Sequence, residues 1–116
     1  MAEFHEENLS TEVKDYHRII KSLIEELEAV DWYNQRADAT DDSSVQGIVE
    51  HNRDEEIEHA CMALEWLRRR YPEWEENLKT FLFTEGDITE LEEEEGEGEE
   101  AENSEGSSSL DIGNLK

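Results

Sequence analysis

With 116 residues, a hydrophobic content of 34% and a mean hydropathy of −0.94, the chain can form one small domain with little core of its own. Its formal charge of −24 makes nucleic acid and anionic membranes poor partners and cations good ones. The single cysteine excludes an intrachain disulfide framework, and neither a signal peptide nor an apolar run of transmembrane length is visible. We therefore expect a cytoplasmic protein whose folding needs more than its own core.

The first predicted helix starts with Ser10 or Thr11 as its N-cap and runs to about Arg36. Its apolar residues form two overlapping stripes at helical spacing. One stripe contains Ile19, Leu23, Val30 and Tyr33, and the other contains Tyr16, Ile20, Ile24 and Leu27. A helix with two apolar stripes needs two neighbours to cover them.

A second helix is predicted from Ser43 to about Arg70, after a break at residues 37–42. Ser43 and Gln46 fit a capping box, with Ser43 as the N-cap and Gln46 at the third helical position. We interpret Cys61 as a packing residue, because no histidine lies one turn away to share a metal with it. The apolar residues of this second helix form two bands. The main band contains Val45, Val49, Ala63 and Leu67, and the other contains Ile48, Ile57, Cys61 and Leu64.

A short third helix is predicted over about residues 73–83, with Pro72 at its start. Up to residue 84 the chain has 21 acidic and 9 basic residues, whereas residues 85–116 have 13 acidic residues and one basic residue. We therefore predict a helical domain over residues 1–84 and a disordered acidic linker over residues 85–109. Residues 110–116 regain three large apolar side chains, which is typical of a docking peptide on a tether: Leu110, Ile112 and Leu115.

Three residues with metal-binding side chains lie on the apolar stripes of the two long helices. Glu26 lies on a stripe of the first helix, and Glu56 lies at the centre of the main stripe of the second. His59 follows Glu56 by three residues, about 60° around the helix. Buried carboxylates are costly without a partner, and a bound cation would stabilise them. Alternatively, both glutamates reach solvent and His59 is a core histidine.

A ferritin-like di-iron centre takes one Glu from each of two helices and one Glu-x-x-His from each of two others. This chain supplies half of that set. We therefore predict an all-α fold in which two long antiparallel helices dimerise into a ferritin-like four-helix bundle. Glu26, Glu56 and His59 would then each occur twice at the dimer interface.

Four stretches of the chain resemble the encapsulated ferritin family: Ile24–Tyr33, His51–Ala60, Phe81–Gly86 and Leu110–Leu115. The resemblance covers nearly the whole chain. It implies a ferroxidase that oxidises Fe(II) with O₂ inside an encapsulin nanocompartment, whose shell stores the mineral. It further implies two iron ions per dimer and dimers that assemble into a ring, commonly a decamer.

The resemblance also implies roles for individual residues. The di-iron ligands of the family match Glu26, Glu56 and His59. Aromatic residues near the centre match Trp32 and Tyr33, and acidic residues proposed to attract ions at its entrance match Glu25 and Glu28. A solvated helix face accounts for Glu25 and Glu28 equally well. The tail is similar to encapsulin-targeting peptides, which insert apolar side chains into pockets on the inner wall of the shell.

Two alternatives remain at this level. A di-metal carboxylate oxidase that uses manganese, or iron with an organic substrate, would need the same ligands. The second alternative is a non-enzymatic helical adaptor, for which removal of Glu26 would stabilise the dimer and change no metal property. Spacing does not separate these possibilities, and the predicted docking peptide favours iron storage.

Overall fold

The structure is a computed structural model that describes residues 3–92. Its elements are α1 (Thr11–Ala39), α2 (Ser43–Arg70), α3 (Pro72–Phe81) and the 3₁₀ turn η1 (Ile88–Glu90). The predicted all-α class is confirmed. The greater part of the predicted linker and the whole predicted docking peptide, with Leu110, Ile112 and Leu115, lie outside the described residues.

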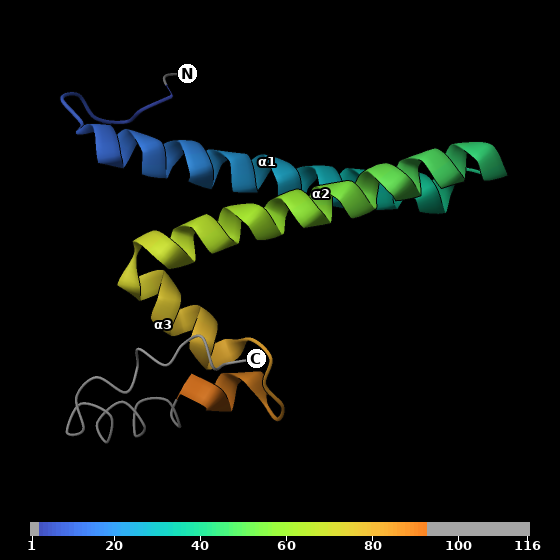
Figure 1. The fold of residues 1–116 in the computed structure, drawn as a ribbon. Coiled ribbons are helices and arrows are strands. Elements are labelled where there is room, and N and C mark those ends of the chain that lie inside the picture. The colour runs from blue at the N-terminus through green and yellow to red at the C-terminus, as the bar shows by residue number, and fades with distance from the viewer. Residues whose placement is uncertain (1–2, 93–116) are drawn as a thin grey trace. The chain divides into compact units, whose positions relative to one another are not determined.

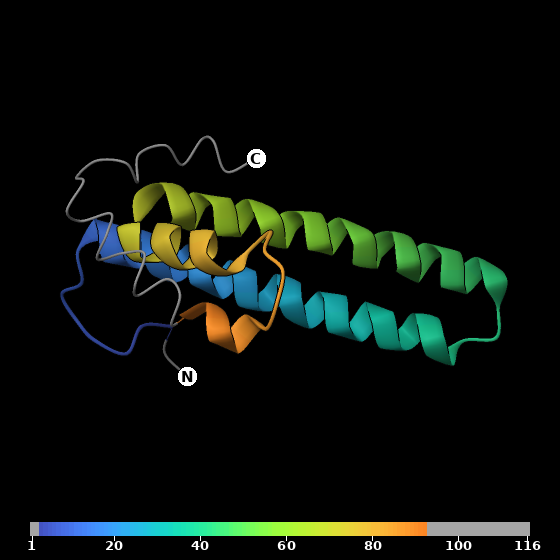
Figure 2. The same cartoon turned by 90° about the horizontal axis from the view of Figure 1, so that it is seen from below.

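The first of two compact units ends at Leu67 and is a helical hairpin. In it α1 and α2 lie side by side and run antiparallel (Figures 1 and 2), as the sequence predicts. Its buried apolar residues come from the predicted main stripes and from the small residues beside them: Leu23, Ala37, Ala60, Ala63 and Leu67. This core is small and rich in alanine, so the hairpin leaves much apolar surface uncovered.

The N-cap of α1 is Ser10, whose Oγ accepts a hydrogen bond from the Val13 amide at 3.1 Å. This confirms the predicted start of the helix. The end is three residues later than predicted, because the helix continues to Ala39 and the Thr40 amide donates to the Arg36 carbonyl at 3.2 Å.

The predicted capping box of α2 is wrong. Asp42 Oδ1 accepts hydrogen bonds from the amides of Ser44 at 2.8 Å and Val45 at 3.1 Å, so Asp42 takes the place predicted for Ser43. Gln46 does not complete a box. Its Nε2 instead donates to the Ala37 carbonyl of α1 at 3.0 Å and thereby joins the two helices near their connection.

The second unit begins at Arg68 and includes α3 and η1. Pro72 occupies the start of α3, as predicted, and the helix ends at Phe81, two residues earlier than expected. The η1 turn lies within the predicted linker, where Asp87 Oδ1 accepts a hydrogen bond from the Thr89 amide at 3.0 Å. Among the described residues, no helix combines the length and apolar character needed to cross a membrane.

Candidate metal centre

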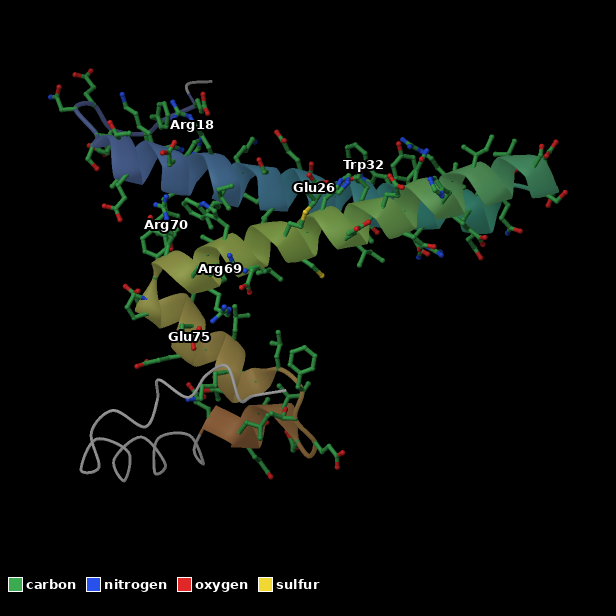
Figure 3. The ribbon with its side chains drawn as sticks, viewed as in Figure 1. Arg18, Glu26, Trp32, Arg69, Arg70 and Glu75 are labelled. Atoms are coloured by element: carbon green, nitrogen blue, oxygen red, sulfur yellow. The ribbon has the colours of Figure 1, made fainter. Side chains whose placement is uncertain are left out.

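Glu26 of α1 and Glu56 and His59 of α2 converge in the middle of the hairpin, where Figure 3 labels Glu26. His59 Nδ1 lies 3.5 Å from Glu26 Oε1 and 3.4 Å from Glu56 Oε1. One ligand atom from each residue lies within 4.8 Å of the other two. Within residues 3–92 this is the one group of three such side chains close enough to hold a single ion.

The group is only partly shielded from solvent in the single chain. The side chains of Glu26 and Glu56 are 26% and 24% exposed, and that of His59 is 40% exposed. Leu23 and Ala60 are buried beside them on the same two helices. His59 is therefore not a core histidine, and the two carboxylates point toward each other and toward the imidazole instead of into water alone.

The carboxyl groups of Glu26 and Glu56 interact strongly with each other in this group. The hydrogen bond with Glu56 is the main cause that raises the pKa of Glu26, followed by partial burial and the charge of Glu56, while His59 opposes the shift. Partial burial would lower the pKa of His59, but the charges of both glutamates and their hydrogen bonds outweigh it and raise that pKa. A divalent cation would relieve the repulsion, because both carboxylates could bind it together.

The other residues predicted near the centre lie around it at different angles. Tyr33 follows Glu26 by two turns on the same side of α1 and is half-buried, with the Arg36 guanidinium 5.2 Å from its ring centroid. Trp32 is 53% exposed (Figure 3), about 120° around the helix from Glu26. Glu25 and Glu28 are exposed and do not belong to the three-residue group.

Two features of this region were not predicted from the sequence. Cys61 is exposed in the single chain, so its packing role stays a prediction that needs a covering partner. A hydrogen bond of 3.0 Å from Arg53 Nη1, one turn from Glu56, to Asn34 Oδ1, about two turns from Glu26, also joins the helices, and sequence reasoning missed it. The sequence feature that could have indicated this contact is the spacing of three residues between Arg53 and Glu56. This spacing places both residues on neighbouring parts of the α2 surface.

Comparison with known proteins assigns the family. A model for EncFtn-like proteins matches residues 2–85, which include α1, α2 and α3. The chain belongs to the EncFtn-like family. Relatives of this EncFtn-like chain include an encapsulated ferritin-like protein of Rhodospirillum rubrum, 50% identical over 117 residues, covering 95% of this chain and 84% of the relative.

Further relatives extend this picture. A ferritin-like protein of Thermotoga maritima is 53% identical over 100 residues, covering 84% of this EncFtn-like chain and 88% of the relative. The encapsulin nanocompartment cargo protein EncC of Myxococcus xanthus is 42% identical over 57 residues, covering 48% and 44% of the two chains. The crystal structure of a Nitrosomonas europaea protein matches with a TM-score of 0.73 and 52% identity, covering 75% of this chain and 99% of that one.

Proposed function

We propose that the chain is a ferroxidase that oxidises Fe(II), with O₂ as the electron acceptor, at a di-iron centre shared by two copies. The supporting observation is the convergence of Glu26, Glu56 and His59 from two helices, with ligand atoms within 4.8 Å. Carboxylates suit the hard Fe(III) ion and imidazole also binds Fe(II), so this ligand set suits both oxidation states of the substrate. Membership of the EncFtn-like family supports iron over manganese.

The proposed centre needs a second copy of the chain. One hairpin offers three side-chain ligands, half of the two Glu and two Glu-x-x-His units of a ferritin-like di-iron site. The side of α2 that bears His59 also bears Ile48 and Met62, which are 62% and 60% exposed. A two-fold dimer would cover these side chains and bring two sets of ligands together, giving two iron ions per dimer.

Neighbouring residues are proposed to serve the same centre. Glu25 and Glu28 are exposed on α1, where their charge would attract Fe(II) toward the ligands. Tyr33 lies on the same side of α1 as Glu26, and exposed Trp32 would be covered only by another chain. Both aromatic residues would limit the access of water to the assembled centre.

The iron product is proposed to be stored within an encapsulin shell. The Rhodospirillum rubrum relative is named an encapsulated ferritin-like protein, and the Myxococcus xanthus relative an encapsulin nanocompartment cargo protein. We assign shell binding to residues 110–116 through Leu110, Ile112 and Leu115. Dimers would assemble further into a ring, commonly a decamer, which presents many such tails at once.

Anaerobic titration with Fe(II), followed by exposure to O₂, tests the proposed activity through the absorbance of Fe(III). Glu26→Ala, Glu56→Ala and His59→Ala should each slow Fe(III) formation by at least about 100-fold, because loss of a ligand should exceed the effect of losing a residue that only supports one. Glu12→Ala and His5→Ala are matched controls, since both residues are exposed and lie outside the group. Their rates should equal that of the unchanged protein.

The same titration separates the alternative functions. Wild-type rates in all three ligand variants would refute the site, and no O₂-dependent oxidation by the unchanged protein would refute the ferroxidase. Preferential binding of Mn(II) would favour a manganese enzyme. Glu25→Ala and Glu28→Ala should slow iron uptake without preventing oxidation of bound iron.

A further inference from the structure

Asn34 and Arg53 form a hydrogen bond between the two helices of the hairpin. Arg53 Nη1 donates to Asn34 Oδ1 at 3.0 Å, and Arg53 Nε donates to Asp54 Oδ1 at 3.0 Å. The Arg53 side chain is 26% exposed. A planar guanidinium held at two of its nitrogens has little freedom left, so it can set the distance and the rotation between the helices that it joins.

Arg53 lies on the flank of α2 opposite to His59. Arg53 comes three residues before Glu56 and His59 three residues after it, so each lies about 60° from Glu56 in opposite directions. On one flank His59 approaches Glu26 of α1 at 3.5 Å, and on the other Arg53 bonds to α1 at 3.0 Å. A rotation of α2 that withdraws His59 from Glu26 would therefore move Arg53 toward α1 and change the geometry of its bond.

Apolar side chains are buried less completely toward the connection of the two helices than toward their open end. Toward the open end, Leu23, Ala60, Ala63 and Leu67 are buried beyond the metal group, whereas toward the connection Ala37 alone is buried among the described residues. A cavity of about 550 Å³ opens there, and it is lined by Asn34, Gln35, Ala37, Asp38, Gln46, Glu50 and Arg53. The metal group thus lies between the more fully buried core and a polar cavity, where polar bonds add to half-buried apolar side chains such as Val30 and Tyr33 in holding the helices.

We propose that Arg53 and Asn34 are positioning residues of the metal centre. Their bond fixes the rotation of α2 against α1 and keeps the ligand atoms of Glu26, Glu56 and His59 within reach of one ion. The inference depends on the proposed function, because it requires an ion at these three residues. Neither Arg53 nor Asn34 touches the ion.

The test is titration of the full chain with Co(II), which is stable to O₂ in this setting and whose visible absorption reports ligand geometry. Arg53→Gln and Asn34→Ala should each weaken Co(II) binding about 10-fold and change the absorption band, as loss of a supporting residue does. The matched control is Arg18→Gln (Arg18 is labelled in Figure 3), because its guanidinium bonds to Asp15 of its own helix at 2.8 Å. It should bind Co(II) like the unchanged protein.

Two further variants show whether the pair acts as a unit. Arg53→Lys keeps a cationic donor for Asn34 and should recover part of the affinity. The double variant Asn34→Ala with Arg53→Gln should bind no more weakly than Arg53→Gln alone, since both changes remove one bond. Thermal melting and helix content are recorded alongside, because a role in stability alone would lower the melting temperature and leave the Co(II) band unchanged.

Two results would overturn the proposal: unchanged Co(II) affinity and absorption in both single variants, or additive losses in the double variant. If Arg53→Gln does not fold, Asn34→Ala decides the outcome. Failure of the proposed function is distinct, because then the unchanged protein would not oxidise Fe(II) with O₂, whatever the Co(II) titrations show.

Discussion

At the scale of single residues, Asp42 determines where α2 begins. Its Oδ1 accepts from the Ser44 hydroxyl at 2.5 Å and from the amides of Ser44 and Val45. These bonds lower the pKa of Asp42, with the Ser44 side chain as the largest cause and the two amides next. The carboxylate form thus stabilises the folded hairpin by occupying amide donors that the helix itself leaves unbonded.

The lowered pKa of Asp42 predicts a dependence of stability on pH. A group whose pKa is lower in the folded protein stabilises it above its ordinary pKa, and this stabilisation is lost as pH falls through the folded-state pKa. Asp42→Ala should therefore lower the melting temperature at about pH 7, and the difference from the unchanged protein should shrink as pH falls below the ordinary pKa of Asp, about 3.9. Circular dichroism melting curves over this pH range measure it.

Asp41→Ala is the control for this prediction, because Asp41 is the adjacent exposed carboxylate and precedes the cap by one residue. Its melting temperature should stay close to that of the unchanged protein. Equal melting temperatures of the Asp41→Ala and Asp42→Ala variants at neutral pH would show that the cap contributes nothing measurable.

At the scale of elements, each long helix has one apolar side in the hairpin and another in solvent. On α2, Ile48 precedes His59 by eleven residues and lies about 20° from it, and Met62 lies about 60° away. Ile57 lies on the other side of α2 and is 45% exposed. The side with His59, Ile48 and Met62 is therefore the one that we expect a second copy to cover when the centre is completed.

Ile48→Asp should abolish metal-dependent dimerisation. Burial of one isoleucine contributes roughly 2 kcal/mol and occurs twice in a two-fold dimer, so association should weaken by up to about 1,000-fold. Metal should promote association of the unchanged protein, because an ion that binds only the dimer stabilises it by mass action. Sedimentation with and without Zn(II) measures both effects.

Ile57→Asp is the matched control, because it places the same charge on the opposite side of the same helix. It should keep the metal-dependent dimer. A monomer that binds two ions tightly, or normal dimerisation of the Ile48→Asp variant, would contradict the shared centre.

At the scale of the whole molecule, hydrophobic periodicity predicted the helices and the convergence of the metal group. The prediction succeeded because Glu26 and Glu56 lie on the stripes that face each other, and two antiparallel helices then bring their midpoints together. The predicted N-cap of α2 was wrong because Asp42 and Ser43 are adjacent and both residue types are good N-caps. The exposure of Cys61 could not be predicted, since an apolar band on a helix does not show whether the other helix of the hairpin or a second chain covers it.

Polar contacts between the helices were beyond sequence reasoning. The bond between Arg53 and Asn34 depends on the rotation of each helix about its axis, which a period of 3.6 residues does not determine to within the length of a side chain. The η1 turn was missed because its cap, Asp87, stands at the start of a segment whose overall composition predicts disorder.

We propose that the chain consists of an iron-oxidising domain (residues 1–84), a tether (residues 85–109) and an address peptide that binds the shell (residues 110–116). In an extended chain Leu110 and Ile112 would point the same way, and a turn at Gly113 would bring Leu115 to a further pocket of the proposed shell. Burial of each side chain contributes roughly 1.5–3 kcal/mol before ordering costs, so a single peptide should bind weakly. A ring with many tails would bind firmly through avidity, and the length of the linker permits simultaneous contacts.

Deletion of residues 109–116 should therefore abolish packaging when the chain is co-expressed with an encapsulin shell protein, and should leave ferroxidase activity unchanged. The matched control removes eight residues of the linker, 98–105, which shortens the tether and keeps the address. This control should still be packaged, because a shorter flexible linker keeps or raises the effective concentration of the address as long as it still spans the distance to the shell. Co-purification of the protein with assembled shells is the measurement, and continued packaging of the first deletion would exclude residues 109–116 as the address.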